Sequence, residues 1–175
     1  MSAIEFALIA FPAGVLLSSV MAIAWRVQQR TGNSGWIDTF WTFGLGVVAV
    51  GLALWPPTPD GWPHMRQLMV AAFSGLWALR LGCHIYLRTI ATDDDPRYRK
   101  LIDDWGADAS AKLFWQLQIQ AAVALLLVLS IVLAAHNPAV GIRAQDILAV
   151  IVLMSGITGE ALADALAPGL TKSPD

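Results

Sequence analysis

The chain has 175 residues, of which 57% are hydrophobic and 14% are charged, and its mean hydropathy is +0.60. A soluble domain of this length could not cover so much apolar surface, so the composition predicts a membrane protein. The formal net charge of -2 gives no sign of a nucleic-acid partner.

Five apolar runs are long enough to cross about 30 Å of hydrocarbon, which takes roughly 20 helical residues. The chain begins Met1-Ser2-Ala3-Ile4-Glu5 without a basic residue, so the first run is interpreted as a retained span rather than a signal peptide. The sequence therefore predicts an all-α, polytopic membrane bundle within residues 1–167 and a polar tail over residues 168–175. The predicted spans are residues 6–25, 36–55, 67–87, 113–135 and 146–167.

The distribution of Lys and Arg predicts the orientation of these spans. Arg26 and Arg30 follow the first run, whereas only Arg66 and Arg143 lie in the loops after the second and fourth runs. A larger basic group follows the third run: Arg88, Arg97, Arg99, Lys100 and Lys112. By the positive-inside rule, the N-terminus is expected outside, and the C-terminus is expected in the cytoplasm if the fifth run crosses the membrane fully.

A short amphipathic helix is predicted in the basic segment after the third run. Asp95 can cap a helix that begins at Pro96, and Gly106 can end it. Four larger side chains then share one face: Tyr98, Leu101, Ile102 and Trp105. This spacing is typical of a helix that lies on the inner leaflet with its basic residues toward the headgroups.

Ionisable residues inside the predicted spans are the strongest functional signal. The orientation places five polar side chains in the cytoplasmic half of the bilayer: Asp38, Arg80, His84, Glu160 and Asp164. A charge in hydrocarbon costs at least about 2.5 kcal/mol, so these groups should face inward and pair with one another or with a ligand. This predicts a polar pocket open to the cytoplasm.

A purely structural interpretation is also open. Arg80 could pair with Glu160 or Asp38 and hold the bundle together, while Asp164 and Arg88 could extend to the interface. The three histidines lack the spacing of a zinc site, so no metal is expected: His64, His84 and His136. The glutamines of the fourth run are expected to form hydrogen bonds between helices: Gln116, Gln118 and Gln120.

Four segments together carry a family resemblance. They are Trp36-Ile37-Asp38-Thr39-Phe40-Trp41, Leu76-Trp77-Ala78-Leu79-Arg80-Leu81-Gly82, Asp94-Asp95-Pro96-Arg97-Tyr98 and Gly159-Glu160-Ala161-Leu162-Ala163-Asp164. In this order they resemble a bacterial membrane family of unknown function that is related to steroid 5-alpha reductases. The resemblance implies an oxidoreductase of the bacterial inner membrane that uses cytoplasmic NADPH to reduce a carbon–carbon double bond conjugated to a carbonyl in a lipid-like substrate. More distant relatives include isoprenylcysteine methyltransferases, so the wider superfamily does not fix the cofactor.

The resemblance also implies roles for individual residues. Asp164 matches an acidic position against the cofactor, Glu160 lies one turn earlier, and Arg97 falls in a loop with basic residues near the cofactor. Arg80 matches a basic position beside the substrate and the nicotinamide, and Asp38 corresponds to an acid in the second helix of the family. Arg80 and Asp38 are therefore the expected catalytic residues.

The segment after Asp164 departs from the family pattern. The family continues into a basic loop with an Arg-His-Pro-Asn-Tyr-like signature, whereas here residues 165–175 are a short tail. We therefore expect a truncated reductase-like protein that is inactive alone and could need a partner chain for the missing helices. The alternative is a non-enzymatic membrane subunit whose acids pair with a basic residue of another protein. A small transporter is disfavoured because five spans contain no inverted repeat pair.

The expected cofactor contacts can be tested directly. Replacing Glu160 and Asp164 together by alanine should abolish NADPH affinity, because both acidic contacts to the cofactor would be lost. Titration of the purified protein with NADPH measures this affinity. NADPH binding that survives the double substitution would contradict the assignment.

Overall fold

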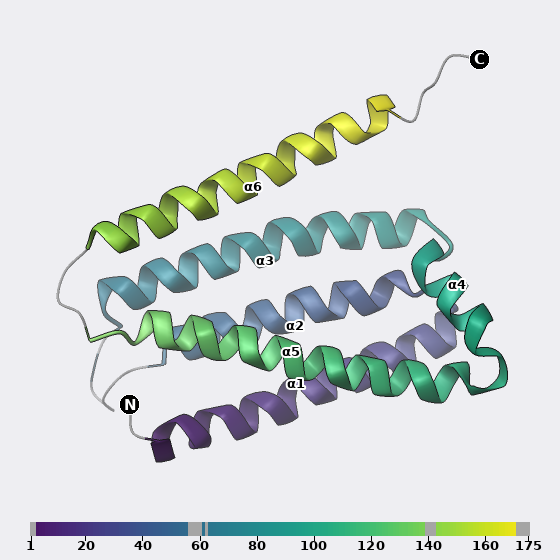
Figure 1. Cartoon of the computed structure of the whole chain (residues 1–175), viewed down its shortest axis with the longest axis horizontal. Helices are drawn as coiled ribbons and strands as arrows, with labels where there is room; N and C mark the ends of the chain where they lie inside the picture. The colour runs from purple at the N-terminus through teal and green to yellow at the C-terminus, as the bar shows by residue number, and fades with distance from the viewer. Residues whose placement is uncertain (1–2, 56–60, 62, 139–142, 171–175) are drawn as a thin grey trace. The chain divides into compact units, whose positions relative to one another are not determined.

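The computed structural model describes residues 3–55, 61, 63–138 and 143–170, the side chains of residues 3–5 and 164–170 excepted. Within these ranges the chain forms helices joined by loops and contains no strand. Figure 1 shows the helices in order along the chain. They are α1 (Ala3–Thr31), α2 (Gly35–Ala53), α3 (Met65–Ala91), α4 (Pro96–Trp105), the 3-10 turn η1 (Gly106–Asp108), α5 (Ala109–Ala135) and α6 (Ala144–Leu170).

The predicted all-α membrane fold is confirmed. Among the described residues, five helical segments are long and apolar enough to cross a membrane. One of these segments, Pro96–Ala135, contains both α4 and α5. Its apolar part lies in α5, because α4 is rich in charged side chains. The chain divides into two compact units, Met1–Asn137 and Pro138–Asp175. The prediction of one membrane domain followed by a tail stays a prediction, and residues 171–175 of that tail lie outside the described residues.

The first unit is a bundle of α1, α2, α3 and α5, which run alongside one another in Figure 1. Both α2 and α5 pack against all the other helices of this bundle. Its core contains fully buried side chains from three helices, among them Met21, Ile37, Leu45, Leu117 and Val128. We call one extremity of this bundle the α4 end. It contains the C-termini of α1 and α3, the N-termini of α2 and α5, and α4 itself.

Small residues bring α2 and α3 close together. A Cβ atom added at Gly46 of α2 would collide with the Cβ atom of Ala78 in α3. A Cβ atom added at Gly82 of α3 would lie 2.7 Å from the ring of Phe43 in α2. Such close contacts provide the van der Waals packing that holds helices together in lipid, where no hydrophobic force drives their association.

The predicted short helix after the third span is confirmed as α4, and its apolar face packs on the bundle. Asp95 caps the helix by accepting the backbone N–H of Arg97 at 2.9 Å, and the helix ends at Gly106, whose φ is +56°. Tyr98 is buried, and the partly buried side chains of Ile102 and Trp105 pack against the bundle core. The reason is the short link from α3, which holds α4 across the helix ends and turns its apolar face toward α5.

The second unit contains α6. The helix starts with a local cap, because the backbone N–H of Arg143 donates to Asp146 Oδ2 at 2.8 Å. The described part of α6 carries Glu160. The side chain of Asp164 lies outside the described residues.

The contact between α2 and α3 generates a stability prediction. Gly46→Ala should lower the free energy of unfolding by about 1–3 kcal/mol, because the new methyl group overpacks the interface at Ala78. Gly51→Ala in the same helix is the matched control, since a Cβ atom there meets nothing within 4 Å. Thermal unfolding in detergent measures both variants. Equal melting temperatures for the two variants would contradict this account of the interface.

Candidate functional site

Asp38 lies in the first turn of α2 and binds two side chains of α4. Its Oδ2 accepts a hydrogen bond from Arg97 Nη2 at 2.9 Å, and its Oδ1 accepts one from the Tyr98 hydroxyl at 3.1 Å. The Asp38 side chain is 25% exposed, so this carboxylate stands at the edge of the bundle rather than deep in its core. The two contacts fasten the start of α2 to the first turn of α4.

Asp95 is the most buried charged group of this region, with 7% of its side chain exposed. Its carboxylate accepts from Arg97 Nε at 3.0 Å and from Arg97 Nη2 at 2.9 Å, a two-pronged contact. Arg88 Nη2, from the last turn of α3, donates to the same carboxylate at 3.0 Å. The hydrogen bond from Arg97 outweighs the effect of burial and holds the pKa of Asp95 below its ordinary value.

Tyr98 places a buried phenol next to Asp38. Its hydroxyl donates to Asp38 and lies 3.4 Å from the Gln120 Nε2 atom of α5, which donates to it. Burial, reinforced by the negative charge of Asp38, raises the pKa of Tyr98 to about 12. The phenol therefore stays protonated at neutral pH and serves as a hydrogen-bond donor.

The adjacent loops are held by a second group of polar contacts. Asp94 Oδ1 accepts the backbone N–H groups of Ser34 and Asp95, each at 2.8 Å. The side-chain amide of Asn33 donates to the carbonyl oxygens of Thr89 and Thr92 at 2.9 and 2.8 Å. The turn between α1 and α2 is thereby bound to the end of α3, which fixes the position of Asp38.

The charges that form ion pairs in this region balance one another. The three aspartates Asp38, Asp94 and Asp95 pair with the three arginines Arg88, Arg97 and Arg99. We call these six residues together with Tyr98 and Gln120 the Asp38 cluster. Because its arginines are neutralised by carboxylates, the cluster suits an uncharged polar group better than a multiply charged phosphate.

The NADPH that the resemblance implies can be compared with these donors. Arg97 uses Nε and Nη2 on the aspartates, but its side chain is 68% exposed and its Nη1 makes none of these contacts. The Nη1 edge of the Arg97 guanidinium fits an uncharged oxygen of the cofactor. The neutral charge balance of the cluster does not fit the cofactor phosphates.

The structure brings together two of the predicted site residues, Asp38 and Arg97. Arg80 lies on α3, eight residues before Arg88 and hence about 12 Å deeper along the helix. Glu160 lies on α6 in the second unit. The roles expected for Arg80, Glu160 and Asp164 stay predictions, as do the catalytic role of Asp38 and the cofactor role of Arg97. Among the described residues, no group of His, Cys, Asp and Glu side chains could hold a metal ion.

The sequence places Tyr98 on an apolar helix face and does not predict the hydrogen bonds of its hydroxyl group with Asp38 and Gln120. The available signal was the position of Tyr98 in the first turn of α4, two residues after Pro96. That position brings the ring against the neighbouring helices. The prediction that glutamines of α5 bond to other helices is confirmed for two of them. Gln120 contacts Tyr98 of α4, and Gln118 Oε1 accepts from the Ser18 hydroxyl of α1 at 2.6 Å.

The lowered pKa of Asp95 predicts a pH-dependent stability. A carboxylate with a depressed pKa stabilises the fold above its unfolded pKa of about 3.9, and this contribution is lost as the pH falls through the folded-state pKa. Asp95→Asn keeps an N-cap acceptor but removes the charge, so it should lower the free energy of unfolding by about 1–2 kcal/mol at pH 7. It should also make the free energy of unfolding less dependent on pH in the acid range.

Thermal unfolding between pH 3 and pH 7 measures this effect. Asp103→Asn is the control, because Asp103 is an exposed residue of the same helix. An unchanged melting temperature for Asp95→Asn at pH 7 would show that the ion pairs contribute nothing.

Comparison with known proteins places the chain in a family. No curated protein and no solved structure matches it. A family model described as "Protein of unknown function (DUF1295)" matches residues 24–174, which is most of the chain. The chain belongs to the DUF1295 family.

Proposed function

We propose that this chain is the substrate-binding part of a membrane reductase, that it binds the carbonyl group of a lipid-like enone at Tyr98 and Asp38, and that it acts together with a partner chain. The single observation that carries the proposal is the buried, protonated Tyr98 hydroxyl held between Asp38 and Gln120. The cluster lies at the α4 end, which the basic residues orient toward the cytoplasm of a bacterial inner membrane. A lipid-like substrate would reach it from the surrounding bilayer.

Reduction of an enone places negative charge on the carbonyl oxygen in the transition state. A fixed hydrogen-bond donor aimed at this oxygen stabilises that charge. When substrate binds, the Tyr98 O–H turns from Asp38 to the carbonyl oxygen, while Gln120 Nε2 continues to donate to the phenol oxygen. Asp38 keeps its ion pair with Arg97 and so holds the start of α4 in place.

NADPH would supply the hydride, as the resemblance implies. Within this chain, the free edge of Arg97 would contact an uncharged part of the cofactor, and Glu160 and Asp164 are the other proposed contacts. Arg80 is the proposed basic residue beside the substrate. Because the Asp38 cluster is electrically neutral, groups outside it would bind the cofactor phosphates, either elsewhere in this chain or in a partner chain.

A second candidate function is that of a non-enzymatic membrane subunit. The ion pairs of Asp38 and Asp95 join α2, α3 and α4, and such pairing by itself explains why these charges are present. In this case the acids of α6 would bind a basic residue of another membrane protein. Co-purification with that protein, and a melting temperature that NADPH does not change, would favour this function.

The phenol provides the sharpest test. Tyr98→Phe should lower the rate of NADPH oxidation in the presence of a lipophilic enone by about 100-fold, because one donor to the developing oxyanion is lost. Tyr86→Phe is the matched control, since Tyr86 contacts Trp36 through its ring, with the ring centroids 6.0 Å apart. The assay follows NADPH absorbance in membranes isolated from the cells that make the protein, where a partner chain can be present.

Two results would contradict the proposal. One is full activity of Tyr98→Phe, which would remove Tyr98 from the site. The other is a wild-type protein that neither oxidises NADPH with any enone nor gains thermal stability from NADPH, which would favour the subunit function.

A further inference from the structure

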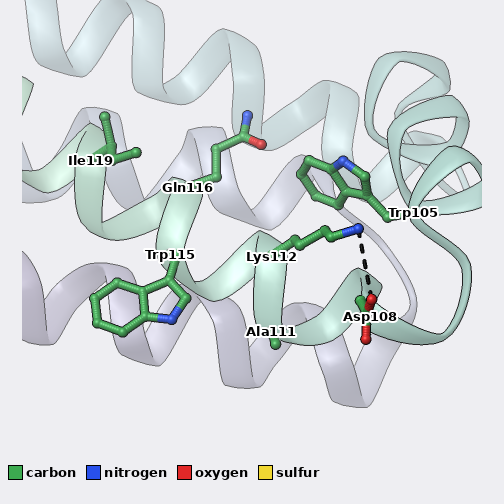
Figure 2. Close-up of a pocket in the computed structure, with 7 residues that line it drawn as sticks. All are labelled: Trp105, Asp108, Ala111, Lys112, Trp115, Gln116 and Ile119. Carbon is green, nitrogen blue, oxygen red and sulfur yellow. Dashed lines mark ion pairs between the residues drawn. The ribbon is translucent and has the colours of Figure 1, made fainter.

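A groove lies at the corner where α4 passes through η1 into α5, apart from the Asp38 cluster. Its volume is about 590 Å³. It is lined by Trp105, Asp108, Ala111, Lys112, Trp115, Gln116 and Ile119. Figure 2 shows the Lys112 side chain reaching toward Asp108 and Trp105, with Ile119 farther along α5. None of these residues takes part in the proposed reductase chemistry.

The groove changes from charged to apolar along its length. Asp108 and Lys112 stand at the α4 end, while Trp115 and Ile119, 67% and 66% exposed, continue along the outer face of α5. Lys112 and Ile119 are seven residues apart, so the groove extends about 10 Å from the first charge toward the apolar part of the span. Tryptophan rings settle at the boundary between headgroups and hydrocarbon, which places the charged part of the groove at headgroup depth.

The two charges are paired only weakly with each other. Lys112 Nζ lies 3.8 Å from Asp108 Oδ2, and the two side chains are 49% and 78% exposed. An exposed pair with this separation gains little, so each charge is available to a ligand. The groove therefore presents one cation and one anion side by side, above an apolar wall.

We propose that this groove binds a phospholipid with a phosphoethanolamine headgroup. The lipid phosphate contacts Lys112 and the lipid ammonium donates hydrogen bonds to Asp108, so both protein charges meet their opposites. The first part of one acyl chain lies along Trp115 and Ile119. A choline headgroup has no N–H to donate, and a glycerol headgroup leaves Asp108 facing an anionic lipid, so both bind less well.

The experiment compares three lipids that have the same acyl chains and carry ethanolamine, choline or glycerol headgroups. Each is added to the purified full chain in detergent, and native mass spectrometry counts the lipids that stay bound. The wild-type protein should retain the ethanolamine lipid best. Asp108→Asn should reduce this preference about threefold, and Lys112→Gln should weaken the retention of all three lipids.

Lys100→Gln is the matched control, because Lys100 is an exposed lysine of α4 outside the groove. It should bind lipids as the wild type does, and Lys112→Arg should do so too because it keeps the charge. Thermal unfolding identifies any variant that fails to fold. Best retention of the glycerol lipid by the wild type, or unchanged binding in both Asp108→Asn and Lys112→Gln, would overturn the proposal.

Discussion

The α4 end depends on the pairing of one nearly buried carboxylate, that of Asp95. Burying a charge is costly unless hydrogen bonds and opposite charges replace the lost water. Asp95 meets this requirement by binding Arg88 of α3 and Arg97 of α4, and its Oδ1 also caps α4. Arg97 then contacts Asp38 of α2. Three helices are thus joined through a short chain of charge-assisted hydrogen bonds.

This arrangement determines the chemical character of the candidate site. Because each arginine of the Asp38 cluster has a carboxylate partner, the distinctive group is the neutral phenol of Tyr98. A protonated phenol in a region of low dielectric suits the recognition of a carbonyl oxygen. The groove on the outer face of α5 is different, since its two charges are exposed and loosely paired. The two regions therefore suit different ligands, although α4 and α5 contribute to both.

Local features of the sequence accounted for most of the fold. The span lengths follow from the hydrocarbon thickness, and α4 follows from a cap at Asp95, a proline at its first position and a glycine at its end. The candidate site was predicted only in part. Asp38 and Arg97 were named for separate roles, yet they bind each other across 59 residues of sequence. Periodicity shows that Tyr98 lies on the apolar face of α4, but it does not show which surface that face meets.

By itself, the sequence determined which described segments form helices long and apolar enough to cross a membrane, and where α4 begins and ends. These properties depend on residues close together in the chain and on the cost of placing polar groups in lipid. Only the tertiary structure decided that Asp38 binds Arg97 and Tyr98, and that the apolar face of α4 packs on the bundle. Those contacts depend on which helices become neighbours, and the short link between α3 and α4 sets that geometry.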